Sequence, residues 1–267
     1  MALPRRQRSL VGRGGGITGL SAKARAHFGQ AKEAARGIPW LVALARFIPD
    51  QAAAAADNTA VLRQVERMEG VLAGLGTLHD RSFARREKEI LAGLSTASSF
   101  EQAQLRLGEL LGFDVGKIEA DASPDPWWIA DDVCLVFEDH AGAEADSVLD
   151  ATKARQAASH PAWMQANVPA CQGAQILPVL VTPVTKAKEG AAPHLNSVAL
   201  WPLQEFREWA KGSLATIREL RRTFSEPGDL VWRARAAEML EAEGLDAPGL
   251  HARLRTRPAA EGLKTVK

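Results

Sequence analysis

Cysteine is scarce in this sequence, and the scarcity narrows the class of protein. Cys134 and Cys171 are the only cysteines, and each lies inside an apolar run typical of a strand. A scaffold held together by disulfides is therefore excluded, and buried reduced thiols, as in a cytoplasmic protein, are expected. At 267 residues the chain is long enough to bury an ordinary hydrophobic core without such links.

Long apolar runs are also absent. No stretch of the sequence approaches the ~20 consecutive apolar residues that a bilayer-spanning helix needs. Near the N-terminus, Arg5, Arg6 and Arg8 are not followed by the apolar core of a signal peptide. The sequence therefore predicts a soluble, unprocessed, cytoplasmic protein that has no membrane partner.

The net charge of +1 conceals a strong separation of charge along the chain. Residues 1–36 carry eight basic side chains and one acidic side chain, a net charge of +7. Residues 114–150 carry one lysine and eleven acids, a net charge of −10, and residues 151–225 return to +5 with nine bases and four acids. A metal-dependent enzyme that acts on a polyanion needs such a pattern, because carboxylates bind the cation while Lys and Arg bind phosphates. Solvated faces of an Ala- and Arg-rich chain are the alternative explanation.

The chain divides into four predicted regions. Residues 1–19 form a basic irregular arm, because Pro4 and three consecutive glycines oppose a helix. Residues 20–95 are predicted to be helical from their alanine content and their apolar spacing. Residues 96–225 form an α/β domain, and residues 226–267 form a C-terminal helical extension.

Helical and strand patterns alternate within residues 96–225. A helix beginning near Ser99 is followed by two short apolar runs that flank a turn at Asp131-Asp132. The order of segments predicts an α/β (or α+β) fold with a central mixed sheet flanked by helices. The predicted strands are 127–130, 133–137, 176–182 and 197–201. The helix 151–166 follows the first two strands, and the helix 203–224 follows the last two.

Acidic side chains stand at the outer ends of the first two predicted strands. Asp125 precedes the first strand and Glu138 ends the second, so a hairpin would bring their carboxylates to one place. Glu138 closes an apolar run, and a carboxylate there needs a partner or an ion. His140 follows two residues later and faces the same side of an extended backbone. Two carboxylates at one edge of a sheet are typical ligands of Mg²⁺.

These motifs resemble the PD-(D/E)xK nuclease superfamily. The resemblance rests on Pro124-Asp125 and on Glu138-Asp139-His140, and it extends over residues 100–209. It implies a restriction-endonuclease-like core and a metal-dependent nuclease in which Asp125 and Glu138 bind Mg²⁺ or Mn²⁺. On the same basis Glu101, on the first helix, is a further metal ligand, and Gln156, on the helix after the hairpin, is an auxiliary residue.

The sequence departs from the superfamily at its lysine, which is replaced by His140. A histidine is only partly charged near neutral pH and cannot supply a fixed positive charge. Lys153 offers a substitute, because it lies three residues before Gln156 and seven before His160 on one face of a predicted helix. The sequence therefore leaves two candidates for the catalytic position, His140 and Lys153.

Basic residues at both ends of the chain are candidates for binding DNA. The predicted arm contributes Arg5, Arg6, Arg8 and Arg13, whose charges can contact phosphates without reading sequence. The helix 203–224 contributes a second group on one broad stripe, with ion pairs to neighbouring glutamates as the alternative. This second group consists of Arg218, Arg221 and Arg222.

The function predicted from the sequence is phosphodiester hydrolysis in DNA. The alternative is a nuclease fold that has lost its chemistry with its lysine and binds DNA or a partner protein, such as a helicase or a component of a defence system. A helical interaction protein whose acidic centre is only a surface is a third reading. A homodimer is left open in each case.

Overall fold

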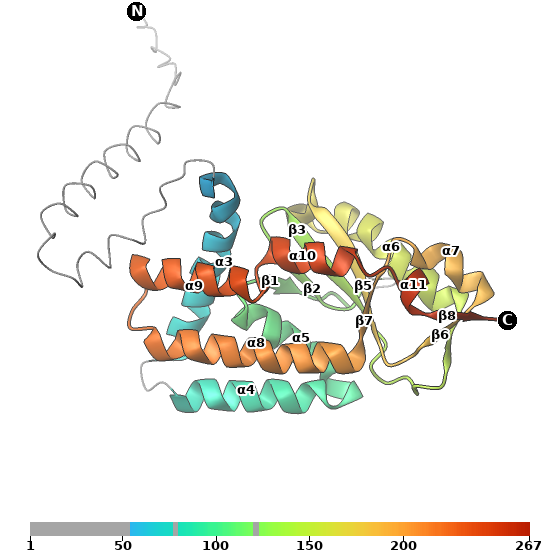
Figure 1. The fold of residues 1–267 in the computed structure, drawn as a ribbon, viewed down its shortest axis with the longest axis horizontal. Coiled ribbons are helices and arrows are strands. Elements are labelled where there is room, and N and C mark those ends of the chain that lie inside the picture. The colour runs from blue at the N-terminus through green and yellow to red at the C-terminus, as the bar shows by residue number, and fades with distance from the viewer. Residues whose placement is uncertain (1–53, 77–79, 120–122) are drawn as a thin grey trace, which may run out of the picture. The chain divides into compact units, whose positions relative to one another are not determined.

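The computed structural model describes residues 54–76, 80–119 and 123–267 of the chain (Figure 1). Within it, residues Ala56–Lys267 form one unit with dense internal contacts. The predicted arm 1–19, with its four arginines, and residues 20–53 of the predicted helical region lie outside the described residues. Among the described residues, no helix combines the length and the apolar character that a membrane crossing requires.

A five-stranded mixed sheet forms the centre of this unit, with the strand order β1-β2-β3-β5-β7. The first three strands make an antiparallel meander, and β3, β5 and β7 run parallel to one another. The α/β fold with a mixed sheet is thus confirmed. The strands are β1 (Asp114–Gly116), β2 (Trp127–Ala130), β3 (Val133–Asp139), β5 (Gln175–Thr182) and β7 (Ala199–Pro202).

Helices cover both faces of the sheet because its strands bury side chains on both sides. Trp128 and Leu135 point into the main core, where they join residues of α5 (Phe100–Leu110) and α8 (Leu203–Thr223). Their neighbours Ile129, Cys134 and Val136 point the other way, where Met164 of α6 (Ala151–Asn167) packs against them. This alternation follows from the two-residue period of a strand.

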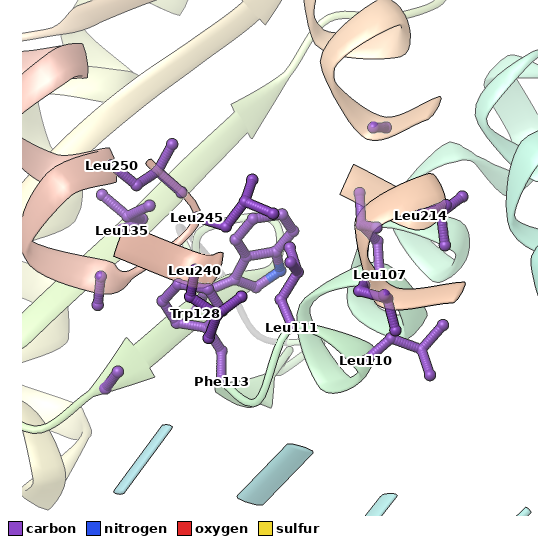
Figure 2. Close-up of a cluster of buried hydrophobic side chains, with 14 of the residues drawn as sticks. Leu107, Leu110, Leu111, Phe113, Trp128, Leu135, Leu214, Leu240, Leu245 and Leu250 are labelled. Carbon is purple, nitrogen blue, oxygen red and sulfur yellow. The ribbon is translucent and has the colours of Figure 1, made fainter. Parts of the chain in front are cut away.

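The main core also includes helices from both ends of the described chain. Figure 2 shows Trp128 surrounded by Leu111, which directly follows α5, and by Leu240 and Leu245 from near the C-terminus. The predicted divisions at 95/96 and 225/226 therefore fall inside a single core. The helices that join it are α3 (Ala54–Gly74), α4 (Asp80–Leu94), α9 (Leu230–Ala242) and α10 (Ala247–Arg255).

Gln64 shows how these distant segments are joined. This buried α3 side chain donates from Nε2 to the main-chain oxygens of Leu111 and Leu245, at 2.8 and 3.0 Å. Its Oε1 accepts a hydrogen bond from the main-chain N–H of Ala247 at 2.9 Å. One glutamine thus satisfies buried backbone groups at the end of α5 and between α9 and α10.

A second, three-stranded sheet was not predicted from the sequence. Its strands run parallel in the order β4-β6-β8, and the last of them lies in the predicted helical extension. Buried residues such as Leu149, Ala187 and Leu263 form a separate core beneath it. The strands are β4 (Val148–Leu149), β6 (Lys186–Lys188) and β8 (Lys264–Val266), and the short helices beside them are α7 (Ala192–Leu195) and α11 (Ala259–Gly262).

Candidate active site

The outer ends of β2 and β3 lie side by side, as the predicted hairpin requires. The turn between the strands has Asp131 at φ 51°, a left-handed conformation that Asp tolerates better than most residues. At the other end, the N–H of Phe137 donates to the carbonyl of Pro126 at 3.0 Å. The N–H of Asp139 donates to Oδ2 of Asp125 at 2.6 Å. Asp125 is therefore fixed directly beside the end of β3.

Glu138 is buried and bonded to two residues of α6. Its side chain is 1 % exposed, Oε1 accepts a hydrogen bond from Nζ of Lys153 at 2.6 Å, and Oε2 lies 2.7 Å from Nε2 of His160. Burial raises the pKa of Glu138, but the bonds to His160 and Lys153 outweigh it and hold the pKa below its ordinary value. The carboxylate has thus found partners within the protein.

The local sequence of α6 explains how both partners reach Glu138. Asp150 caps the helix by accepting the N–H of Lys153 at 2.9 Å. Lys153 and His160 stand seven residues apart, or about two turns, so they share one face. Ala154 and Ala157 on this side are buried, and their small side chains let the helix approach the sheet.

Lys153 carries a positive charge at the edge of this site. Its side chain is 38 % exposed, unlike that of His160, which is fully buried. Burial lowers the pKa of Lys153, whereas the hydrogen bond and charge of Glu138 raise it, and the net effect is an increase. The ammonium group is therefore charged at neutral pH and lies at the boundary between Glu138 and solvent.

His140 also lies close to Lys153 and Glu138, but its imidazole is not charged. Its main-chain N–H donates to the carbonyl of Val181 at 2.8 Å, and its Nδ1 is buried without a hydrogen bond. Burial lowers the pKa of His140, and the charge of Lys153 lowers it further. Of the two candidates from the sequence, Lys153 thus supplies the fixed charge and His140 does not.

Asp125 is destabilised as a carboxylate. Burial raises its pKa to about 6, despite the bond from the N–H of Asp139, and the charges of Glu138 and Glu101 act in the same direction as burial. Only the charge of Lys153 opposes them among the neighbouring side chains. A cation at this position would relieve the repulsion, as expected for a metal ligand.

Asp139 and Gln104 were missed by the sequence reasoning. Both carboxylate oxygens of Asp139 and both amide atoms of Gln104 are buried without a hydrogen bond. Burial and the nearby Asp125 raise the pKa of Asp139 well above its ordinary value, while Gln104 lowers it without offsetting this effect. Burial therefore favours the protonated, neutral form of Asp139. The alternation of side chains along β3 could have pointed to Asp139, because it turns Asp139 away from Glu138 and toward α5.

Glu101 and Gln156 lie at the margin of the site. Glu101 belongs to the first turn of α5 and forms an ion pair with Lys117 at 2.5 Å. The bonds to Glu101 and Glu119 raise the pKa of Lys117. Gln156 is half-buried on α6, between Lys153 and His160. The structure brings Glu101 close enough to influence Asp125, but its carboxylate is already paired.

The side chains of the site determine which kind of metal binding is possible. Across residues 54–76, 80–119 and 123–267, no three His, Cys, Asp or Glu side chains converge closely enough to hold one ion. A closed protein cage is therefore not formed in this part of the chain. A hydrated Mg²⁺ commonly uses only one or two carboxylates and keeps several waters. Asp125, with its raised pKa, fits that second arrangement.

The arginines of α8 do not form the free stripe that the sequence suggested. Arg218 is paired with Glu87, and Arg222 with Glu219 at 3.0 Å. Arg221 is 6 % exposed and donates to the carbonyl of Gly76 at 3.1 Å, so its guanidinium group is turned into the protein. Ion pairing and burial, rather than a shared basic surface, account for these residues.

Comparisons with known proteins do not assign a function to these residues. No family model, curated protein or solved structure matches this chain. The resemblance to PD-(D/E)xK nucleases therefore depends on the order of elements and on the side chains gathered at the ends of β2 and β3.

Proposed function

We propose that this chain is a metal-dependent nuclease of the PD-(D/E)xK type that hydrolyses phosphodiester bonds in DNA. The observation that carries this proposal is the 2.6 Å contact between Nζ of Lys153 and Oε1 of Glu138. It supports a lysine acting from α6 in place of the one missing at His140. The contact lies beside Asp125, whose raised pKa favours a bound cation.

Each residue has a defined role in this proposal. Asp125 and Glu138 would hold a hydrated Mg²⁺ or Mn²⁺, which when bound lowers the pKa of a coordinated water and stabilises charge on the phosphate. Lys153, charged and partly exposed, positions the attacking water or the phosphate oxygen. His160 holds the second oxygen of Glu138, and Glu101 and Gln156 are auxiliary residues at the margin.

The alternative is a binding module without catalysis, and one observation favours it. Both oxygens of Glu138 are already engaged, by Lys153 and His160, so the metal would have to compete with these partners or use Asp125 alone. A module of this kind would bind DNA or a partner protein through the same fold. Cleavage assays separate the two functions.

The first prediction concerns Lys153. Purified protein should cleave plasmid or linear DNA with Mg²⁺ or Mn²⁺ and stop when the metal is chelated. Lys153→Met should reduce the rate by roughly 10²–10⁴, the range typical of a group that assists proton transfer. Lys211→Met, at an exposed α8 lysine, is the matched control and should leave the rate unchanged. Adding His140→Lys to Lys153→Met should restore part of the rate if residue 140 can reach the site.

The same assay should include Glu138→Gln rather than Glu138→Ala. Removing the whole carboxylate would leave the buried His160 and the partly exposed Lys153 without their partner, so a loss of activity could reflect unfolding. Gln keeps the shape and should lose cleavage while the protein stays folded. Absence of cleavage in the wild type, despite measurable binding of Mn²⁺, would contradict the nuclease and favour the binding module.

A further inference from the structure

The outer face of the three-stranded sheet carries three lysines at neighbouring positions. Lys186 and Lys188 belong to β6 and Lys264 to β8, and the register places Lys186 directly opposite Lys264. None of the three forms an ion pair with any residue in the described ranges. Ala187 between them is buried and points into the core below, so the lysines share the other face.

This arrangement is unfavourable within the protein itself. Two ammonium groups at matched positions of the parallel strands β6 and β8 repel each other, whereas an ammonium and a carboxylate there would attract each other. A chain that needed only a stable sheet could place Glu or Thr at one of these positions. The two lysines are therefore better explained by an anionic partner than by the fold.

The lysine face begins beside the candidate active site. Leu149 of β4 pairs with Ala187, which brings the next residues, Asp150 and Lys188, to neighbouring positions. The charge of Lys188 accordingly lowers the pKa of Asp150, after the larger effect of the Lys153 N–H. Asp150 in turn caps α6 immediately before Lys153.

The surface of α8 differs from this face. There the exposed Arg218 and Arg222 are paired with Glu87 and Glu219. In Figure 1, α8 runs beside α4, whereas β6, β8 and α11 gather at the opposite end of the described unit from the α8–α9 turn. Lys186, Lys188 and Lys264 therefore form a compact group of positive charge that no salt bridge with a described residue neutralises.

We propose that the phosphate backbone of DNA lies across Lys186, Lys188 and Lys264 on its way to Lys153. Lys186 and Lys188 are two residues apart on a strand, about 6.6 Å. This is close to the roughly 6.8 Å along the axis that separates two phosphates two nucleotides apart on one DNA strand. The proposal rests on the proposed function for the identity of the ligand. The new element is the path of the DNA over the protein surface, which lies away from α8.

Binding should be measured without cleavage, by fluorescence anisotropy of labelled duplex DNA in chelator at several salt concentrations. Changing Lys186, Lys188 and Lys264 together to Gln should weaken binding and lower the salt dependence by up to about 2.7, at roughly 0.9 for each phosphate contact. The control, Arg218→Gln with Arg222→Gln, should leave the salt dependence unchanged. The proposal would be overturned if the control variant bound DNA more weakly and the lysine variant bound it as tightly as the wild type.

A single substitution separates binding from folding. Lys264→Glu places an acid opposite Lys186 and replaces repulsion with attraction, so the thermal midpoint should rise while DNA binding weakens. A purely structural role for Lys264 would give the reverse pattern. Wild type that binds DNA through these lysines but never cleaves it would refute the proposed function alone. Wild type that binds polyglutamate as tightly as DNA, or does not bind DNA, would refute the lysine surface.

Discussion

The residues around Glu138 show what a sequence pattern can and cannot reveal. Helical spacing correctly placed Lys153 and His160 on one face of α6, and burial of Glu138 correctly demanded a partner or an ion. The identity of the partners was not predictable, because the contacts span fifteen and twenty-two residues and depend on how α6 packs on the sheet. The prediction of the hairpin did not include the opposite orientations of the Glu138 and Asp139 side chains.

Asp125 gives a pH prediction at the residue scale. Its pKa in the folded protein is about 6, above its ordinary value of 3.8, so the folded state binds the proton more tightly than the unfolded state. The free energy of unfolding should therefore fall as the pH rises from about 4 to about 6 and stay reduced above it. At about 1.4 kcal/mol per pKa unit, the loss is no more than about 3 kcal/mol.

Urea denaturation between pH 4 and pH 7 tests this prediction. Asp125→Asn should remove this share of the pH dependence and should be more stable than the wild type at pH 7, but not at pH 4. Asp150→Asn is the matched control, because the pKa of Asp150 is lowered and its contribution to stability is lost only as the pH falls. An Asp125→Asn profile parallel to that of the wild type would show that Asp125 titrates normally.

At the scale of elements, long segments were predictable and short ones were not. The predicted helix 203–224 and strand 176–182 differ from α8 and β5 by one residue at one end, because their apolar patterns are long and regular. Strands β1, β4, β6 and β8 have two or three residues and little apolar character, so no period can be read from them. Their pairing depends on partners far away in the chain. The lysine face of the second sheet was missed for that reason.

The contact between α5 and β2 gives a prediction about packing. A Cβ on Gly108 would lie 2.4 Å from Nε1 of Trp128, which is fully buried and packs against Phe113 and Phe137. Gly108→Ala should therefore lower the free energy of unfolding by about 1–3 kcal/mol, the usual cost of overpacking. Gly70→Ala, in α3 with no atom within 4 Å, should instead stabilise the protein by up to about 1 kcal/mol.

Urea denaturation of the two variants measures both changes in the same helical context. Because alanine favours a helix at either position, any difference between them reports the contact with Trp128 rather than helix propensity. Equal stabilisation of both variants would mean that α5 can move away from β2 without cost.

At the scale of the whole molecule, the core determines which parts of the chain belong together. The sequence pattern predicted that residues 226–267 form a C-terminal extension. These residues contribute Trp232, Leu240 and Leu254 to the same core as the sheet. Nε1 of Trp232 donates to the carbonyl of Leu220 at 2.9 Å, which ties α9 to α8. A sequence read segment by segment cannot detect such sharing, because the apolar residues of a helix do not reveal which neighbour they pack against.

Two truncations follow from this shared core. Deleting residues 226–267 removes five large core side chains, and burial of each is worth about 1.5–3 kcal/mol, so the summed loss reaches the whole stability of a typical domain, roughly 5–15 kcal/mol. This variant should not show a cooperative thermal transition by circular dichroism. The side chains removed are Trp232, Leu240, Leu245, Leu250 and Leu254.

Deleting residues 1–53 is the matched control, because it removes none of the described core. The variant that begins at residue 54 keeps α3 and the bonds of Gln64, so its thermal transition should stay cooperative with a midpoint close to that of the full chain. A cooperative transition at an unchanged midpoint after deletion of residues 226–267 would contradict this assignment. It would mean that α3, α5, α8 and the sheet close a stable core without α9 and α10, and that the C-terminal helices only cover it.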